Sequence, residues 1–316
     1  MKITVLDRLA MGDDLDFSIF SDLGELEVFD TTSAQQVSER VTNSNIILTN
    51  KVKITAQVMQ SAKNLQLICV FATGYDNIDL AYAKEHGVGV CNVPAYSTES
   101  VTLFTVATAL TLATHLFEYR EHVASGEYSS AGKANCLKPV YHELKGKTWG
   151  ILGCGTIGSR VGEVARSLGC RVITHQRHKS DLFDTVDLET LLRESDILSL
   201  HCPLTESTRA IIGEEELNKM KKNSILVNEA RGAVCDEQAV ADAVVEGHIG
   251  AFGADVYSTE PFGETHPMYR IKDLPNVCLT PHAAWGAFES RRRALDIVYQ
   301  NMSAFKNGEI KNRVDQ

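Results

Sequence analysis

Thr148-Trp149-Gly150-Ile151-Leu152-Gly153-Cys154-Gly155-Thr156-Ile157-Gly158 joins an apolar, strand-like run to a Gly-x-Gly-x-x-Gly pattern, and a helix-like segment, residues 159–168, follows. In a dinucleotide site the first such glycine makes a tight turn, the second lets a pyrophosphate approach the backbone, and the third allows close helix–strand packing. The positive end of the helix then faces the anion. The pattern alone is weak evidence, but a strand before it and a helix after it indicate a nucleotide site. The plain alternative is a tight turn without a ligand.

Length and charge limit the class of protein. A chain of 316 residues is too long for one ordinary core, so we expect one large or two medium domains. Its 44% hydrophobic and 23% charged residues are typical of a globular protein. A formal net charge of −10 argues against a nucleic-acid partner. A few arginines in a cleft can nevertheless bind an anionic ligand.

The cysteines and the apolar runs indicate the compartment. The eight cysteines form no Cys-x-x-Cys pair and mostly lie within or beside apolar runs. We interpret them as buried apolar residues of a reducing cytosol, and we expect neither a disulfide framework nor a metal site. The chain starts with a strand-like run, residues 1–7, so we expect no signal peptide. No apolar run reaches the ~18 residues of a membrane span, so we expect a cytoplasmic protein without a membrane partner.

The first hundred residues alternate short β-rich runs with polar segments that are compatible with helices, such as 31–41 and 53–62. The strand candidates are Ile3–Asp7, Leu26–Asp30, Asn45–Thr49, Leu65–Phe71 and Val88–Val93. This rhythm predicts βαβ units on a parallel sheet. Beyond Pro94, residues 97–100 begin a predicted long helix that continues to about His122, and a Gly/Ser-rich loop, residues 125–132, follows.

From Lys147 the rhythm restarts. Strands are predicted near residues 148–152, 171–175, 196–201, 224–229, 250–256 and 276–280. Six strands with crossovers make a complete doubly wound domain. A last helix is predicted over residues 287–306. Because the two βα blocks differ in length and glycine pattern, we expect an α/β protein of two domains with a cleft between them.

Polar residues follow three consecutive strands of the second block. Arg231 follows the strand that ends near Ala230, Asp255 ends the next strand with Glu260 in its loop, and His282 follows Pro281 after the last strand. Each has a plain explanation alone: an exposed arginine, a solvated carboxylate, a histidine that caps a strand. Ligands of open α/β sheets bind beyond the carboxyl ends of the strands, where all of these residues fall. Together they indicate a functional site.

The chemistry of these side chains indicates hydride transfer. An arginine grips a carboxylate through two parallel hydrogen bonds. A histidine beside a carboxylate is held in one tautomer and can donate a proton to a carbonyl oxygen. With a glycine-rich nucleotide loop, this set indicates reduction of a 2-oxo acid by a nicotinamide cofactor.

The chain resembles the D-isomer-specific 2-hydroxyacid dehydrogenase family. The matching stretches begin with Ala72-Thr73-Gly74-Tyr75-Asp76-Asn77-Ile78-Asp79, Asn92–Val101 and the loop at 148–158. They continue with His201-Cys202-Pro203-Leu204-Thr205, Asn228-Glu229-Ala230-Arg231-Gly232, Asp255–Pro261 and Pro281-His282-Ala283-Ala284-Trp285. They span residues 45 to 290 approximately, in the order of the family.

The resemblance implies a Rossmann-type domain, residues 99–286, and a smaller flavodoxin-like substrate domain, residues 1–98 with 287–316. It implies that Arg231 orients the substrate, that His282 is the general acid/base and that Glu260 pairs with it. Thr73 and Gly74 would present backbone amides to the substrate carboxylate, and Asp255 would hold the nicotinamide carboxamide. The full set of implied cofactor residues is Thr105, Gly153, Gly155, Thr156, Ile157, Gly158, Gln176, Arg177, His201, Cys202, Pro203, Thr208, Glu229, Ala230, Arg231, Asp255, His282 and Ala284.

Two positions depart from the pattern of the family. Gln176 stands where NAD-dependent members carry an Asp that binds the ribose hydroxyls, and Arg177, His178 and Lys179 follow it. A neutral Gln followed by cationic residues attracts a 2′-phosphate, so we favour NADP(H) over NAD(H). The alternative is that Gln176 binds the ribose of NAD. At the second position Glu229 replaces a small or hydroxyl residue, and we expect its side chain to point away from the cofactor phosphates or to be bridged.

The substrate is predicted less sharply. Residues 141–147 and 72–79 look most like hydroxypyruvate/glyoxylate reductases (glycerate dehydrogenases). Trp285 is expected to wall the pocket, or else to pack between domains, and Lys51 to reach the side chain of the substrate. Alternatives are a reductase of D-lactate type or for another 2-oxo acid, a 3-phosphoglycerate dehydrogenase-like enzyme, and a non-catalytic NAD(H)-sensing scaffold of corepressor type. The resemblance also implies a homodimer.

Overall fold

The computed structural model describes all residues, 1–316, as two compact units. Unit 1 comprises Met1–Ser97 and Gly286–Gln316, and unit 2 comprises Thr98–Trp285. The predicted domain boundaries lie one residue from these. Both units are α/β, and every strand pairing within the two sheets is parallel, so the predicted fold class is confirmed.

Unit 1 contains a five-stranded sheet in the order β2-β1-β3-β4-β5, which is the flavodoxin-like order. Its strands are β1 Lys2–Val5, β2 Glu25–Val28, β3 Ile46–Thr49, β4 Leu67–Val70 and β5 Gly89–Cys91. Its helices are α1 Val37–Val41, α2 Ala56–Ser61, α3 Leu80–Glu85 and α12 Phe288–Lys306, with 3-10 turns η1 Arg8–Met11 and η2 Phe17–Leu23.

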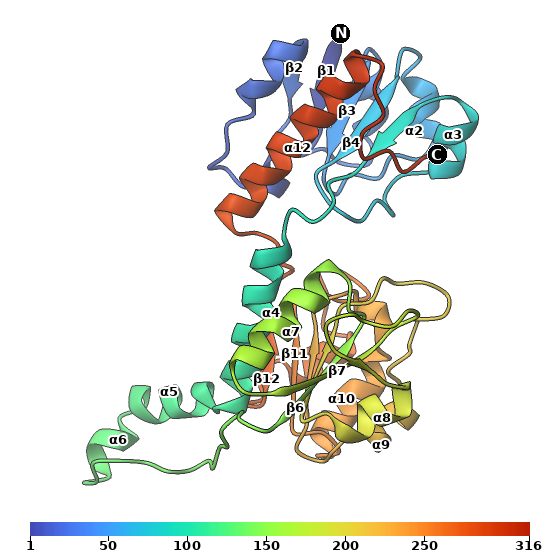
Figure 1. Ribbon diagram of the computed structural model, residues 1–316. Coiled ribbons are helices and arrows are strands. Elements are labelled where there is room, and N and C mark those ends of the chain that lie inside the picture. The colour runs from blue at the N-terminus through green and yellow to red at the C-terminus, as the bar shows by residue number, and fades with distance from the viewer. The chain divides into compact units, whose positions relative to one another are not determined.

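Helices cover the sheet of unit 1. Strands β3 and β4 are buried along their whole length, as expected of runs such as Ile46-Ile47-Leu48 in a sheet covered on both sides. Residues of α1, α2 and α3 share one apolar cluster with Ile47 and Ile68. Helix α12 packs on β4 and η2, and it runs along the sheet in Figure 1. The last segment of the chain therefore belongs to unit 1.

Unit 2 contains a seven-stranded sheet in the order β12-β11-β10-β9-β6-β7-β8. Its strands are β6 Thr148–Leu152, β7 Arg171–His175, β8 Asp184–Thr185, β9 Ile197–Leu200, β10 Ile225–Asn228, β11 Ala251–Ala254 and β12 Val277–Leu279. Read from β8 to β11, this is the doubly wound order 3-2-1-4-5-6, extended by one strand. The strand prediction is confirmed except for β8, a two-residue polar strand that was missed.

The two faces of this sheet pack against different helices. The helices are α4 Thr98–Ala113, α5 Leu116–Ala124, α6 Glu127–Ser130, α7 Thr156–Ser167, α8 Leu188–Glu194, α9 Glu214–Lys219, α10 Glu237–Val245 and α11 Pro267–Ile271, with a 3-10 turn η3 Gly232–Val234. One apolar cluster joins Val106 and Ala109 of α4 and Val161 of α7 to the sheet. A second cluster joins α8, α9, α10 and α11 to the opposite face.

The segment after α4 corrects two predictions. The single helix predicted to end near His122 is two helices, α4 and α5, bent by 64°. His115 causes the break, because its φ of 52° is left-handed and cannot continue an α-helix. Its Nδ1 lies 2.7 Å from Oε2 of Glu118, which fixes the start of α5. The loop predicted at 125–132 contains the short helix α6.

All eight cysteines are free thiols, and six are buried; Cys136 and Cys278 are only partly covered, so the prediction of burial is wrong for these two. No single helix has both the length and the apolar character of a membrane span, and α4 with α5 passes such a test only as a bent pair.

Candidate functional site at the carboxyl edge of unit 2

The polar residues singled out in the sequence follow neighbouring strands. Arg231 comes shortly after β10, Asp255 directly after β11 and His282 shortly after β12, and these three strands are adjacent in the sheet. Parallel strands have their carboxyl ends at one edge, so the three residues share the edge to which β6 delivers the glycine loop.

His282 and Glu260 form a close polar pair at this edge. Nδ1 of His282 lies 2.6 Å from Oε2 of Glu260, and the two side chains are 26% and 31% exposed. Oε1 of Glu260 accepts a hydrogen bond from the backbone N–H of Tyr257 at 2.9 Å. Since an ionised carboxylate only accepts, Nδ1 carries the hydrogen of the pair. Nε2 is then the ring atom that can exchange a proton with a ligand.

Asp255 holds the turn that carries His282. Its buried carboxylate accepts hydrogen bonds from the Thr280 hydroxyl at 2.6 Å and from the backbone N–H groups of Ala283 and Ala284, both at 2.8 Å. His282 itself has a φ of 55°, a left-handed conformation that non-glycine residues seldom adopt. Such strain persists only where the surroundings fix it. Asp255 is therefore a structural anchor for the histidine turn.

Arg231 is exposed on the turn after β10. One of its terminal nitrogens donates to the backbone oxygen of Ala230 at 2.8 Å. Asn228, at the end of the strand, shapes this turn: its side chain donates to the backbone oxygen of Arg231 at 3.0 Å and accepts from the N–H of Ala230 at 3.1 Å. The guanidinium thus starts from a fixed backbone and reaches toward solvent.

The three glycines of the loop after β6 have different surroundings. Gly153 has a φ of 93°, and a Cβ there would lie 2.6 Å from the backbone nitrogen of Cys202. A Cβ on Gly158 would lie 2.2 Å from the backbone oxygen of Gly153, whereas a Cβ on Gly155 would meet nothing within 4 Å. The first and third glycines are therefore needed for packing. The second leaves open space beside the backbone, which fits the approach of a phosphate group.

The start of α7 also fits an anion. Gly155 is its N-cap and contributes no side-chain hydrogen bond to the first turn, which begins with Thr156 and Ile157. The first N–H groups of a helix have no partner within it, and the helix dipole makes that end positive. This 12-residue helix therefore presents the donors that a pyrophosphate uses.

Gln176 lies against the glycine loop. Its side-chain oxygen accepts from the backbone N–H of Cys154 at 3.1 Å, directly after β7. Arg177 is exposed, and its guanidinium is 3.4 Å from the hydroxyl of Ser207. His178 and Lys179 are exposed as well. No carboxylate is in this segment between His175 and Ser180.

The loop after β9 packs beside the glycine loop. Both ring nitrogens of His201 are buried without a hydrogen-bond partner, and burial lowers the pKa of this histidine to about 3, so the ring is neutral. Cys202 packs against Gly153, and burial raises the pKa of its thiol to about 11. Downstream, the Thr208 hydroxyl donates to the backbone oxygen of Pro203 at 2.6 Å and closes the loop.

The remaining predicted residues lie elsewhere. Thr105 is buried in α4, and its hydroxyl donates to the backbone oxygen of Val101 at 2.8 Å. In unit 1, Thr73 and Gly74 follow β4, and the Thr73 hydroxyl donates to the backbone oxygen of Val93 at 2.8 Å. Lys51 follows β3 and is exposed, with its backbone N–H bonded to Asp7 at 2.6 Å. Trp285 is half-buried at the end of unit 2.

Sequence reasoning missed a network beside Glu260. Nε2 of His266 lies 3.1 Å from Glu237, and both side chains are nearly buried. Glu237 also accepts a hydrogen bond from the backbone N–H of Ser258 at 3.0 Å. The contacts fix the loop from Ser258 to His266, in which Glu260 lies. The residues are far apart in sequence and no motif joins them, so only the fold reveals them.

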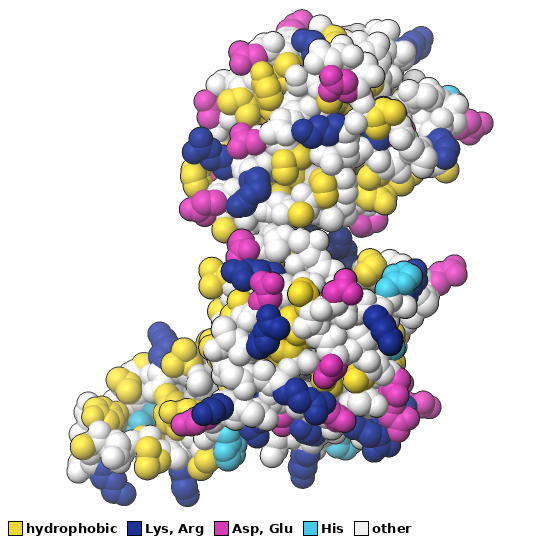
Figure 2. Space-filling model, viewed as in Figure 1, with side chains coloured by type: hydrophobic (Ala, Val, Ile, Leu, Met, Phe, Trp, Pro, Cys, Tyr) yellow, Lys and Arg dark blue, Asp and Glu magenta, His cyan; other side chains and the backbone are white.

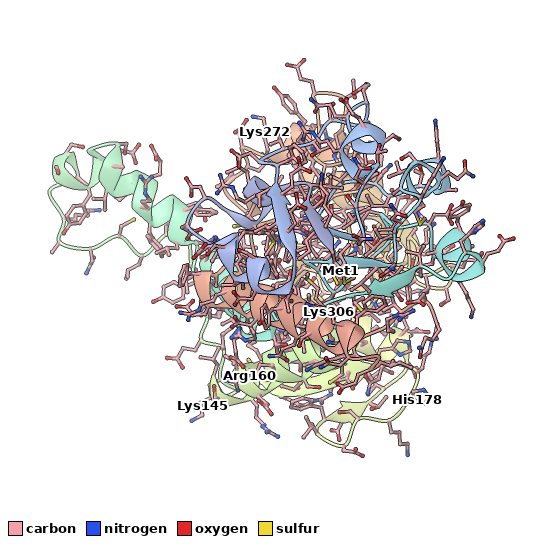
Figure 3. The ribbon with its side chains drawn as sticks, turned by 90° about the horizontal axis from the view of Figure 1, so that it is seen from above. Met1, Lys145, Arg160, His178, Lys272 and Lys306 are labelled. Atoms are coloured by element: carbon pink, nitrogen blue, oxygen red, sulfur yellow. The ribbon has the colours of Figure 1, made fainter.

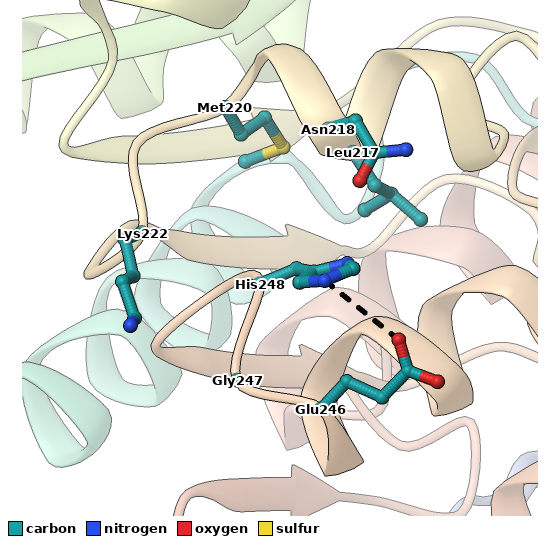
Figure 4. Close-up of a pocket in the computed structure, with 7 residues that line it drawn as sticks. All are labelled: Leu217, Asn218, Met220, Lys222, Glu246, Gly247 and His248. Carbon is teal, nitrogen blue, oxygen red and sulfur yellow. Dashed lines mark ion pairs between the residues drawn. The ribbon is translucent and has the colours of Figure 1, made fainter.

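A hollow near the other edge of this sheet has no comparable chemistry. It encloses about 400 Å³ between the ends of α9 and α10 (Figure 4). Figure 4 shows one ion pair there, between Glu246 and His248 at 3.7 Å. These residues precede β11, and the hollow is therefore at the amino edge, away from His282.

The chain is similar to known proteins over its whole length. Residues 106–284 match the family model described as D-isomer specific 2-hydroxyacid dehydrogenase, NAD binding domain. A hydroxypyruvate reductase of Blautia hydrogenotrophica is 36% identical over the whole of both chains. A glyoxylate reductase of Aeropyrum pernix is 40% identical, over 82% of this chain and 78% of its own. The D-lactate dehydrogenase of Aquifex aeolicus, solved with NAD and lactic acid, superposes with a TM-score of 0.88 at 26% identity, covering 100% of this chain and 99% of that one.

Proposed function

Because the chain belongs to the D-isomer-specific 2-hydroxyacid dehydrogenase family and is a nicotinamide-dependent oxidoreductase, we propose that it reduces hydroxypyruvate and glyoxylate to D-glycerate and glycolate. The observation that carries the proposal is the 2.6 Å pair of His282 and Glu260 at the edge that bears the glycine loop. The names of the two relatives, hydroxypyruvate reductase and glyoxylate reductase, support this pair of substrates.

The nicotinamide cofactor supplies the hydride, and the chain supplies the residues that bind it. In this proposal the pyrophosphate lies on the open side of Gly155 and at the first turn of α7, formed by Thr156 and Ile157. Gly153, Gly158 and the loop from His201 to Thr208 form the walls. Asp255, Glu229, Ala230 and Ala284 lie toward the nicotinamide end. The open space at Gly155 and the uncapped helix support this assignment.

We favour NADP(H) as the cofactor. The segment after β7 offers a neutral amide from Gln176 and the exposed cations Arg177 and Lys179, with no carboxylate to repel a 2′-phosphate. Arginine grips phosphate oxygens through paired hydrogen bonds. NAD(H) would instead be bound through hydrogen bonds between its ribose hydroxyls and Gln176. The first case predicts a lower KM for NADPH than for NADH, and the second predicts the reverse.

The proposed acid–base group is His282. Glu260 fixes Nδ1–H, so the protonated ring presents Nε2–H to a carbonyl oxygen of the substrate. After the proton has been transferred, the ring is neutral and stays hydrogen-bonded to Glu260 through Nδ1–H. Arg231 would bind the carboxylate of the substrate through two hydrogen bonds and polarise its carbonyl group. Thr73 and Gly74 would add backbone amides, Trp285 a wall, and Lys51 a cation for a polar substituent.

We also propose a homodimer in the cytoplasm. The segment Leu116–Tyr141 exposes seven large apolar residues, Leu116, Phe117, Val123, Tyr128, Leu137, Val140 and Tyr141. Figures 1 and 3 show α5 and α6 projecting from the sheet of unit 2, and Figure 2 shows apolar side chains over this projection. Such a surface fits a second copy of the chain. Light scattering should show a dimer that L137D with V140D splits and that L182D, at an exposed leucine outside this segment, does not.

A steady-state panel tests the function. Glyoxylate, hydroxypyruvate, pyruvate and a bulky 2-oxo acid are each supplied with NADPH and, in parallel, with NADH. The proposal predicts the highest kcat/KM for hydroxypyruvate or glyoxylate with NADPH. A clear preference for pyruvate or the bulky acid contradicts the substrate, and a preference for NADH contradicts the cofactor. Tight cofactor binding without turnover on any acid would indicate a sensing scaffold instead.

A further inference from the structure

Glu229 has a buried carboxyl group without a hydrogen-bond partner. Six buried side-chain polar atoms in the structure lack one, and four of them belong to His201 and Glu229. These residues directly follow β9 and β10 at the carboxyl edge. An unpaired buried polar atom in a folded protein needs a specific explanation, such as a functional group whose partner is a ligand. The concentration of such atoms at this edge points to a ligand there.

The strand register places Glu229 in a row with other functional residues. Asn228 is paired with Leu200 of β9 and with Ala254 of β11, so one residue further on Glu229 stands between His201 and Asp255. The ladder continues there, because the N–H of Asp255 donates to the backbone oxygen of Asn228 at 3.2 Å. Glu229 therefore lies between two residues proposed to contact the cofactor.

Alternation along β10 decides which face the side chain takes. Ile225 and Val227 belong to the apolar cluster on the face of the sheet that α4 and α7 cover. Since alternate residues of a strand point to the same face, Glu229, two residues after Val227, points to this face as well. The N-terminal part of α4 covers this edge, where the Ser100 hydroxyl donates to the backbone oxygen of Ala284. From Ser100 to Thr114, α4 and the residue after it contain no ionisable side chain. This helix supplies no cation to pair with Glu229.

The groups that face Glu229 favour its neutral form. They are Asp255 and Tyr257, which follow β11, and Cys278 of β12; the neutral His201 stands beside Glu229 in the strand register. Burial first, and then the charge of Asp255, raise the pKa of the Glu229 carboxyl well above its ordinary value. A neutral carboxyl can donate one hydrogen bond and accept others, which a carboxylate cannot.

We propose that Glu229 acts as a neutral carboxylic acid whose O–H donates a hydrogen bond to an uncharged oxygen of the bound nicotinamide nucleoside, and that its ionised form weakens cofactor binding. The inference rests on the proposed function. The residue as a whole is only half-buried although its oxygens are covered, so rotation about its side-chain bonds turns the carboxyl toward a ligand at the edge. An ionised Glu229 would stand next to the charge of Asp255 and have no proton to give.

The test is the dissociation constant of NADPH and NADH for the intact protein, measured by titration calorimetry from pH 6 to pH 10. Wild type should bind more weakly as pH rises through the Glu229 titration, whereas Glu229→Gln, which still donates, should lack this part of the dependence. Glu229→Ala should bind NADPH about threefold to tenfold more weakly at neutral pH. Its affinity for adenosine 2′,5′-bisphosphate, which has no nicotinamide nucleoside, should stay unchanged.

Two controls complete the experiment. Glu246→Gln removes a glutamate charge from the amino edge and should reproduce the wild-type pH dependence. Infrared spectroscopy should show a protonated-carboxyl band in wild type that is absent from Glu229→Gln and shifts when NADPH is added. Parallel pH curves for wild type and Glu229→Gln overturn the inference, even if Glu229→Ala does not fold. Failure of both reduced cofactors to bind at any pH overturns the proposed function as well.

Discussion

The Nδ1 atom of His282 lies 2.6 Å from Oε2 of Glu260, although 22 residues separate the two in the chain. Glu260 is in turn held by the N–H of Tyr257 at 2.9 Å. The pair therefore has a fixed geometry: the carboxylate accepts from Nδ1 and leaves Nε2 for the substrate.

Glu260→Gln should lower kcat by roughly a hundredfold or more, the usual contribution of an oriented acid–base group. The amide can still accept from Tyr257, but its NH₂ group then faces Nδ1 and favours the other tautomer of His282. The imidazolium also loses its countercharge. Initial rates with hydroxypyruvate and NADPH, together with the NADPH dissociation constant, measure the effect. A variant with unchanged kcat would contradict the role of Glu260.

Alanine at two glycines of the loop should have opposite consequences. Gly158→Ala places a methyl group 2.2 Å from the backbone oxygen of Gly153 and should lower the thermal stability of unit 2. Gly155→Ala meets nothing within 4 Å and should leave stability unchanged while weakening NADPH binding, because the methyl group takes the space proposed for the pyrophosphate. Thermal unfolding and cofactor titration of both variants separate the two cases. Unchanged NADPH binding by Gly155→Ala would place the pyrophosphate elsewhere.

Gln176→Asp should change the cofactor preference. A carboxylate after β7 repels a 2′-phosphate and can bind both ribose hydroxyls. We expect KM for NADPH to rise about tenfold or more, since a charged contact contributes roughly 1.5–3 kcal/mol, while KM for NADH falls or stays constant. Lys222→Ala, which removes one exposed cation at the amino edge of the sheet, serves as the control and should leave both KM values unchanged. If Gln176→Asp changes both KM values equally, Gln176 does not determine the preference for the 2′-phosphate of NADPH.

Glu229 should also make stability depend on pH. Its pKa is raised in the folded chain, so the folded state keeps a proton that the unfolded state loses near pH 4.5. The contribution of Glu229 to the free energy of unfolding therefore falls as pH rises from about 4.5 toward the folded-state pKa. Glu229→Gln removes this slope and should be the more stable protein at pH 8, by about 1–3 kcal/mol. Unfolding midpoints of both proteins at pH 5 and pH 8 test this; a constant difference between them would contradict it.

The sequence predicted the regular part of the fold well, because its signals are local. The strands predicted at 148–152 and 171–175 coincide with β6 and β7. Strand β8 was missed, since two polar residues have no periodicity to detect. The break at His115 was missed because neither Gly nor Pro marks it, and the left-handed turn is visible only in the structure.

The site divides in the same way. That Arg231, Asp255 and His282 lie at one edge of the sheet could be predicted from the order of the strands along the chain. The anchoring of the His282 turn by Asp255 and the network of Glu237 with His266 could not, because they depend on contacts between distant loops. Of the two alternatives for Glu229, a bridged side chain does not hold, since its oxygens are buried without a partner; that it points away from the cofactor phosphates stays a prediction. The register of β10 with its neighbours and the alternation of side chains along β10 determine the surroundings of Glu229, and both are known only once the sheet is complete.

The most direct test of the central claim is the effect of His282→Ala on turnover and on cofactor affinity, measured with the same preparation. We expect kcat for hydroxypyruvate reduction with NADPH to fall at least a hundredfold, since the proton donor is removed, while the dissociation constant of NADPH changes less than about threefold. A His282→Ala enzyme that retains wild-type kcat would contradict the account of this site.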